Sequence, residues 1–129
     1  MATFTTISSD KLARLIGTAN APVLIDVRTE EDFAADRRLI PGSIKLSHET
    51  VAEWGGEFAG RSAIVSCLRG AKLAQGTAAW LRQLGAEAET LEDGFEGWKA
   101  AKLPLVDARK LPPRDAKGRT IWVTRARPK

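Results

Sequence analysis

The only cysteine of the chain, Cys67, lies between an apolar run and a segment with helical periodicity. The run Ser62–Ser66 predicts a buried strand, and Ala71–Leu84 predicts a helix that begins just after the cysteine. A thiolate is a strong nucleophile, and positive potential favours its formation. A loop between a strand and a helix supplies converging N–H groups and the positive end of the helix. We therefore expect Cys67 to be a nucleophile.

The loop that follows Cys67 has the residue types of an anion-binding site. Arg69 and Lys72 carry positive charges that attract an anionic substrate, and Gly70 lets the backbone close where a side chain would intrude. The expected substrate-binding residues supply these charges and the N–H groups of the loop: Leu68, Arg69, Gly70, Ala71 and Lys72. A lone cysteine at a strand end is often only a small buried hydrophobic residue, and that alternative stays open.

His48 and Arg28 are two further polar residues that could take part in the site. His48 is the only histidine, and nothing in the sequence places it beside Cys67, so a structural or solvated role is favoured over that of a base. One Cys and one His do not fill a coordination shell, so neither a metal nor a cofactor is expected. Arg28 is interpreted as a substrate contact or, preferably, as a structural ion-pair partner.

Predicted strands and helices alternate through residues 5–102 with short connections. Continuous apolar runs such as Val23–Ile25 are typical of strands that are buried on both faces. This pattern predicts an α/β fold with a mostly parallel central sheet of about five strands, flanked by helices on both faces. Parallel strands end at one edge, where ligands normally bind. Four polar or reactive residues follow predicted strand ends and are expected at that edge: Arg28, His48, Cys67 and Asp93.

Further expectations concern individual helices. Thr29 is expected to cap a helix that runs to about Arg38. A second, short helix is expected to end at Gly55-Gly56. The helix after Cys67 is expected to place its large apolar residues on one face, with smaller ones beside them: Leu73, Trp80 and Leu84, then Ala74, Ala78 and Leu81.

Composition indicates one soluble domain, because 43% of the 129 residues are apolar and 28% are charged. No apolar run approaches the length of a membrane span, and Met1–Thr5 lacks the regions of a signal peptide. A single cysteine forms no internal disulfide, and a reactive thiol suits a reducing compartment. The expected location is the cytoplasm.

The positive net charge belongs to the C-terminal part of the chain. Residues 108–129 hold eight Lys or Arg against one Asp, which leaves a net charge of −3 in residues 1–107. We expect a domain over residues 1–106 and a basic linker or tail over 107–129. Because the tail lacks a run of adjacent cations, a solvated linker is favoured over contact with nucleic acid or a membrane. The apolar Ile121–Val123 suggests the start of a truncated second domain.

Four segments in order resemble the motifs of one family. They are Asp26-Val27-Arg28, Ile40-Pro41-Gly42-Ser43-Ile44, Cys67–Lys72, and Leu91–Trp98 followed by Leu103-Pro104. Each segment is a weak signal alone, but their order and spacing are specific. Over about residues 5–105 the chain resembles a single rhodanese domain.

The resemblance implies a sulfurtransferase. Cys67 would attack the outer sulfur of thiosulfate or a related donor, release sulfite and become a persulfide, which cyanide or a thiol then discharges. The N–H groups of Leu68–Lys72 would hold the persulfide charge, while Arg69 and Lys72 would attract the donor. The six-residue loop resembles the sulfur-transferring members, whereas related phosphatases have one residue more and end in Arg. Phosphatase or arsenate chemistry is therefore disfavoured.

The sequence departs from the family pattern at several positions. Lys72 stands where Arg is common and lacks its planar fork, while Leu68 and Ser66 replace residues that are often polar and aromatic. Leu39 stands where His often precedes the Ile-Pro-Gly, and Gly94 keeps only the second glycine of a pair.

The segment Thr120–Lys129 resembles the opening of a chromate-resistance-associated domain. An alternative function is therefore a regulatory or redox-sensing module coupled to such a partner domain.

Overall fold

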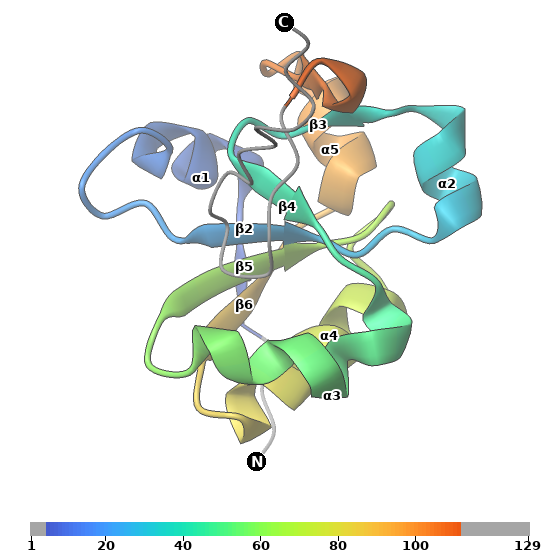
Figure 1. Ribbon diagram of the computed structural model, residues 1–129. Coiled ribbons are helices and arrows are strands. Elements are labelled where there is room, and N and C mark those ends of the chain that lie inside the picture. The colour runs from blue at the N-terminus through green and yellow to red at the C-terminus, as the bar shows by residue number, and fades with distance from the viewer. Residues whose placement is uncertain (1–4, 112–129) are drawn as a thin grey trace, which may run out of the picture.

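Five parallel strands form the central sheet, in the order β1-β6-β5-β2-β4 (Figure 1). The computed structural model describes residues 5–111. The strands are β1 Thr6–Ile7, β2 Val23–Asp26, β4 Ser43–Lys45, β5 Ser62–Ser66 and β6 Glu87–Leu91. The predicted α/β fold with about five mostly parallel strands is confirmed, and β5, which leads to Cys67, is the middle strand.

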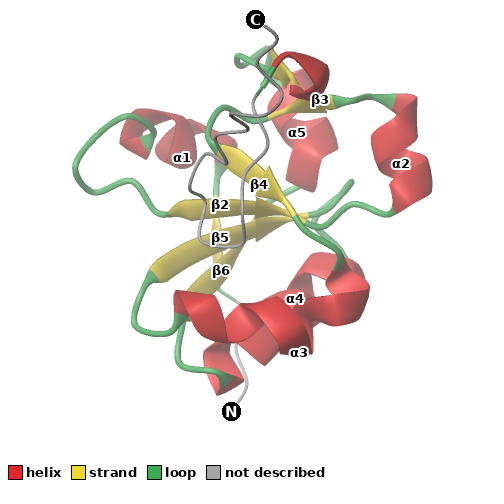
Figure 2. Ribbon diagram, in the orientation of Figure 1, coloured by secondary structure: helices red, strands yellow, loops and turns green. Residues whose placement is uncertain are grey.

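Helices cover both faces of the sheet (Figure 2). On one face lie α1 Ser9–Leu15 and α5 Gly94–Ala100, and on the other lie α3 Val51–Trp54 and α4 Lys72–Gln83. A fifth helix, α2 Glu30–Ala35, lies beyond the end of β2. The described residues also form three short 3₁₀ helices: η1 His48–Thr50, η2 Gly55–Phe58 and η3 Ala108–Lys110.

The side chains of β5 alternate between two hydrophobic clusters. Ala63 and Val65 pack in the cluster on the α3 and α4 face, while Ile64 packs in the cluster on the α1 and α5 face. All three are buried, as expected for a strand with helices on both sides. Cys67 continues the alternation and joins the α3 and α4 cluster.

The buried face of α4 differs from the predicted one. Ala74, Ala78 and Leu81 have no exposed surface, whereas Trp80 is 50% exposed. Small side chains let the helix approach the sheet closely, so the alanine stripe faces inward and Trp80 turns toward solvent, while Leu73 packs partly buried against the same cluster. The prediction that Trp80 shares the buried face is therefore wrong.

The helix predicted to run to Arg38 is shorter in the structure. Asp36 takes an extended backbone after α2, and its carboxylate accepts the N–H of Arg38 at 3.2 Å. This side-chain bond competes with the continuing helix. Arg38–Leu39 then form β3, which pairs antiparallel with β7, Val106–Asp107.

The described structure continues past the predicted domain boundary at residue 106. Asp107 takes part in β7 and then caps η3 by accepting the N–H of Arg109. Residues 112–129, with the segment that resembles a chromate-resistance-associated domain, lie outside the described residues. The boundary at 106 and the role of the tail stay predictions.

α3 ends at Trp54, directly before Gly55-Gly56, as predicted. The chain tightens there into η2, which carries the fully buried Phe58. A Cβ atom at Gly55 would lie 2.7 Å from Cδ1 of Leu84, at the end of α4. The glycine thus allows α3 and α4 to pack closely, which the sequence pattern did not indicate.

Candidate active site at the carboxyl edge of the sheet

Cys67 follows β5 at the middle of the sheet edge where the parallel strands end. Its side chain is 4% exposed. Arg28 follows β2, His48 follows β4 and Asp93 follows β6, so the predicted sharing of one edge agrees with the topology. Figure 1 shows this edge at the right of the sheet, where the arrowheads of the central strands point.

The first turn of α5 holds the loop formed by residues 67–72, which we call the Cys67 loop. The N–H of Phe95 donates to the Cys67 carbonyl at 2.8 Å, and the N–H of Glu96 donates to the Leu68 carbonyl at 2.9 Å. In a trans peptide the carbonyl and the following N–H point in opposite directions. The N–H groups of Leu68 and Arg69 therefore point away from α5.

Two glycines allow this close approach. Gly70 has φ of +69°, and a Cβ atom there would lie 2.8 Å from the Leu91 carbonyl oxygen. Gly94 has φ of +59°, and its Cβ atom would lie 2.5 Å from both the Cys67 carbonyl oxygen and the Gly70 nitrogen. The backbones of the Cys67 loop and of the β6–α5 turn thus touch where no side chain fits.

The N-terminus of α4 is open toward the Cys67 loop. Ser8 and Thr29 cap α1 and α2 with side-chain hydrogen bonds, whereas the cap residue of α4, Ala71, makes none, and the first turn of α4 has no acidic residue. The first N–H groups of a helix and its positive end attract anions when no cap occupies them. Arg69 and Lys72, both exposed, add full charges beside this helix end.

Arg28 is a buried ion-pair residue rather than an exposed cation. Its side chain has 0% exposure, and its guanidinium lies 2.8 Å from the Asp26 carboxylate. It also donates to the Asp36 carbonyl at 2.8 Å and to the Arg38 carbonyl at 2.7 Å. The expected substrate contact is not supported by this geometry, which instead fits the ion-pair interpretation.

Arg28 also connects β2 to the helix that holds the Cys67 loop. Its guanidinium carbon lies 3.9 Å from the centroid of the Phe95 ring, a cation–π contact. Phe95, which is buried, donates its N–H to the Cys67 carbonyl. The sequence pattern does not indicate Gly94 or Phe95 as site residues, although Asp93-Gly94 has the residue types of a turn.

His48 lies on η1, outside the Cys67 loop, and lines a neighbouring pocket. Among residues 5–111, no group of three His, Cys, Asp or Glu side chains is arranged to hold a metal ion. Within the same residues, no helix is both long and apolar enough to cross a membrane.

Comparison with known proteins identifies the family. The rhodanese-like domain family matches residues 8–101. The chain belongs to the rhodanese-like family. It is 33% identical over 112 residues to the thiosulfate sulfurtransferase GlpE of Actinobacillus succinogenes, a match that covers 85% of this chain and 97% of that protein.

Solved structures share the fold. A protein from Lactobacillus plantarum superposes with a TM-score of 0.69 and 25% identity, covering 79% of this chain and 87% of that one. A thiosulfate sulfurtransferase from Pseudomonas aeruginosa gives a TM-score of 0.68 and 22% identity, covering 92% of this chain but 22% of the longer protein. A rhodanese-like domain protein from Staphylococcus aureus gives a TM-score of 0.65 at 22% identity, covering 74% and 91%.

Three of the four family motifs of this rhodanese-like chain are connected in three dimensions. Arg28 of the first motif contacts Phe95 of the last, and Phe95 binds the Cys67 loop. The indole N–H of Trp98 donates to the Pro104 carbonyl at 2.7 Å, which joins the final motif to the Leu-Pro segment after it. The motif residues thus form one connected support behind the cysteine.

Proposed function

We propose that this chain is a sulfurtransferase that moves sulfane sulfur through a Cys67 persulfide. The Cys67 thiolate attacks the outer sulfur of thiosulfate or a related donor, the sulfur–sulfur bond of the donor breaks, and sulfite leaves with the electron pair. Cyanide or a thiolate then attacks the outer sulfur of the persulfide, and the pair of the broken bond returns to Cys67. This displacement chemistry needs no metal or cofactor.

One observation carries the proposal: the carbonyls of Cys67 and Leu68 are bound to α5. The opposite N–H groups are therefore directed to the side where a charged sulfur would lie, and the uncapped end of α4 adds to them. Preorganised donors of this kind stabilise charge that develops during a reaction. Arg69 and Lys72 are placed to attract the donor anion.

The match to a protein named as a thiosulfate sulfurtransferase, over 85% of this chain, supports the same reaction class. The Cys67 loop has the six-residue length expected for sulfur transfer rather than for a tetrahedral phosphate. A reducing compartment such as the cytoplasm would keep Cys67 in the thiol form.

Intact-mass measurement after incubation with thiosulfate tests the proposal. We expect the protein to gain one sulfur atom, to lose it on addition of cyanide, and to gain none as the Cys67→Ser variant. Absence of sulfur uptake at every donor concentration would overturn sulfur transfer. Reversible oxidation of Cys67 without turnover would favour the redox-sensing alternative.

A further inference from the structure

An open hollow lies beside the Cys67 loop, on the side that faces α5. It has a volume of about 530 Å³, and its lining residues come from the loop and from α5 with the turn before it: Arg69, Asp93, Glu96, Gly97 and Ala100. The N–H groups of Leu68 and Arg69 point away from α5. The carboxylates of the hollow therefore act on an anion bound by these N–H groups through their charge, at a distance, and not by direct contact.

Asp93 reaches this hollow through two features that weaken the local structure. Its backbone has φ of +61°, in a region that glycine adopts at no steric cost and other residues rarely enter. One turn further along α5 lies Gly97, where an added Cβ atom would overlap the Cβ of Asp93. Glycine inside a helix is less favourable than alanine. The chain thus accepts two unfavourable features at the position of one carboxylate.

The described residues offer no stabilising partner for the Asp93 carboxylate. It makes no capping hydrogen bond to the N–H groups of α5, and it is exposed. Among residues 5–111, neither Asp93 nor Arg69 takes part in an ion pair, whereas Asp36 and Asp107 are each paired with an arginine. The charge of Asp93 is therefore free to act on an ion that approaches the neighbouring loop.

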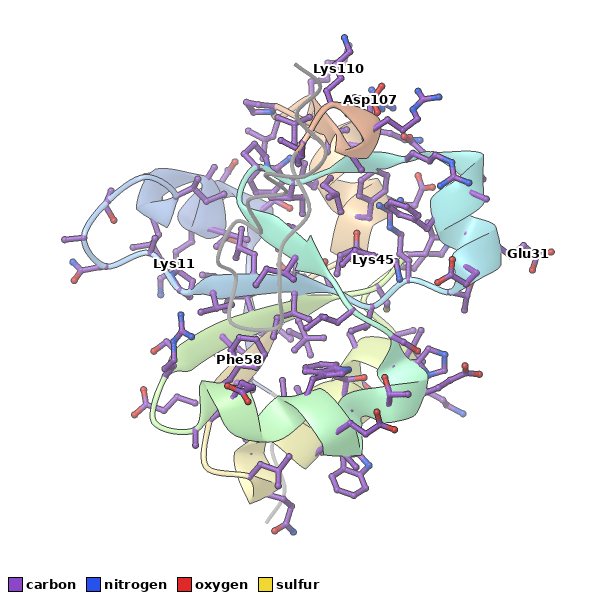
Figure 3. All side chains as sticks on the ribbon, in the orientation of Figure 1. Lys11, Glu31, Lys45, Phe58, Asp107 and Lys110 are labelled. Atoms are coloured by element: carbon purple, nitrogen blue, oxygen red, sulfur yellow. The ribbon has the colours of Figure 1, made fainter. Side chains whose placement is uncertain are left out.

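The backbone of Asp93 lies against the Cys67 loop. A Cβ atom at Gly70 would be 2.9 Å from the Asp93 nitrogen. The strands that lead to the two residues, β5 and β6, are neighbours in the sheet and lie about 4.8 Å apart. The Asp93 carboxylate is therefore within about 10 Å of the loop, a distance over which exposed charges interact. By contrast, the exposed Glu31 extends from α2 away from the sheet (Figure 3).

We propose that Asp93 is a specificity-determining residue of the Cys67 site that discriminates against doubly charged sulfur donors. This inference rests on the proposed sulfur transfer and concerns the charge of its donor. Arg69 and Lys72 attract every anion, and the Asp93 carboxylate reduces that attraction in proportion to the charge of the anion. A dianion such as thiosulfate is disfavoured most, and a donor with one negative charge is disfavoured less.

The size of this effect follows from charge and distance. For two unit charges about 8 Å apart in water, removal of one changes the local concentration of the other about twofold. The interaction energy doubles for a dianion, so the factor is squared, to about fourfold. A neutral reagent should not respond. This dependence on charge distinguishes an electrostatic effect from a change in the shape of the loop, which would affect all reagents alike.

Asp93→Asn tests the proposal, because it removes the charge and keeps the size of the side chain. Sulfur uptake from subsaturating thiosulfate is followed by intact mass, and Cys67 is alkylated with iodoacetate, a monoanion, or with neutral iodoacetamide, all in about 10 mM salt. The two anion rates are divided by the iodoacetamide rate, which removes any change in the reactivity of the thiol itself. We expect the thiosulfate value to rise about fourfold and the iodoacetate value about twofold, and about 1 M salt to abolish both increases.

Two more variants of Asp93 and one control complete the set. Asp93→Gly also removes the charge and should give the same increases, whereas Asp93→Glu keeps the charge and should give none. Glu87→Gln is the matched control, because Glu87 pairs with Ser62, five residues before Cys67, and so lies about 16 Å from the loop along the strand. It should leave both values unchanged.

Unchanged or lowered values in Asp93→Asn, or equal increases in Glu87→Gln, overturn the role of Asp93. These outcomes are distinct from a failure of the sulfur-transfer proposal. If thiosulfate loads no sulfur onto any variant but Asp93→Asn doubles the iodoacetate value, sulfur transfer fails and the electrostatic role of Asp93 is supported. If sulfur is loaded and neither value changes, sulfur transfer is supported and the role of Asp93 fails.

Discussion

Gly94→Ala is expected to damage the Cys67 loop far more than a glycine substitution with the same backbone strain elsewhere. Gly17 and Gly94 both have positive φ, +85° and +59°, but a Cβ atom meets nothing within 4 Å at Gly17. Placing alanine in this region costs about 1–2 kcal/mol at either site. At Gly94 the Cβ atom would also lie 2.5 Å from two backbone atoms. Such overpacking adds about 1–3 kcal/mol, for a total loss of about 2–5 kcal/mol.

Thermal unfolding and thiol chemistry measure the two parts of this effect. The melting temperature should fall by about 4 °C for each kcal/mol, so Gly94→Ala should melt clearly below Gly17→Ala. The rate of sulfur uptake from thiosulfate should fall in Gly94→Ala and stay unchanged in Gly17→Ala, because only the first displaces the carbonyl and nitrogen of the loop. Equal melting temperatures and equal uptake rates in the two variants would refute the interlocked-backbone argument.

Two further predictions concern buried and partly buried ion pairs. Arg28→Met should lower the free energy of unfolding, measured in urea, by about 3–5 kcal/mol, because it leaves the Asp26 carboxylate buried without a partner. The double variant Asp26→Leu/Arg28→Met should lose less unfolding free energy than the sum of the two single losses. Strict additivity of the losses would contradict the pairing of Arg28 with Asp26. The Arg38 guanidinium, hydrogen-bonded to Asp36, holds the pKa of that carboxyl well below its usual range. Asp36 therefore stabilises the folded state above about pH 4, and this stabilisation is lost as the pH falls further. Asp36→Asn should therefore lose less unfolding free energy than the unsubstituted protein between about pH 5 and about pH 3, and an identical loss would exclude this role.

The sheet could be predicted from sequence because its signals are local. Val23–Ile25 and Ser62–Ser66 are continuous apolar runs, and each forms a strand with helices on both faces. The strand–loop–helix setting of Cys67 follows from the same local pattern. These features need no knowledge of distant contacts, since side-chain periodicity and chain alternation are enough to give the parallel sheet and its carboxyl edge.

The features that the sequence did not reveal depend on distant contacts. Trp80 and Ala78 lie on adjacent stripes of α4, and periodicity alone does not tell which stripe meets the sheet. Arg38 leaves the helical pattern because it pairs with residues at the far end of the described chain. Phe95 binds the Cys67 loop through a hydrogen bond from its backbone N–H, and a pattern of side chains does not predict such a bond.

The donors that hold the Cys67 loop have a consequence for biosynthesis. Phe95 and Glu96 come after the cysteine in the chain, and so does the β6–α5 turn against which Gly70 packs. A nascent chain that ends before residue 94 contains the thiol and the strand that carries it, but not the N–H groups that turn the loop carbonyls. Because Phe95 comes 28 residues after Cys67, the thiol leaves the ribosome before the N–H groups that hold its loop.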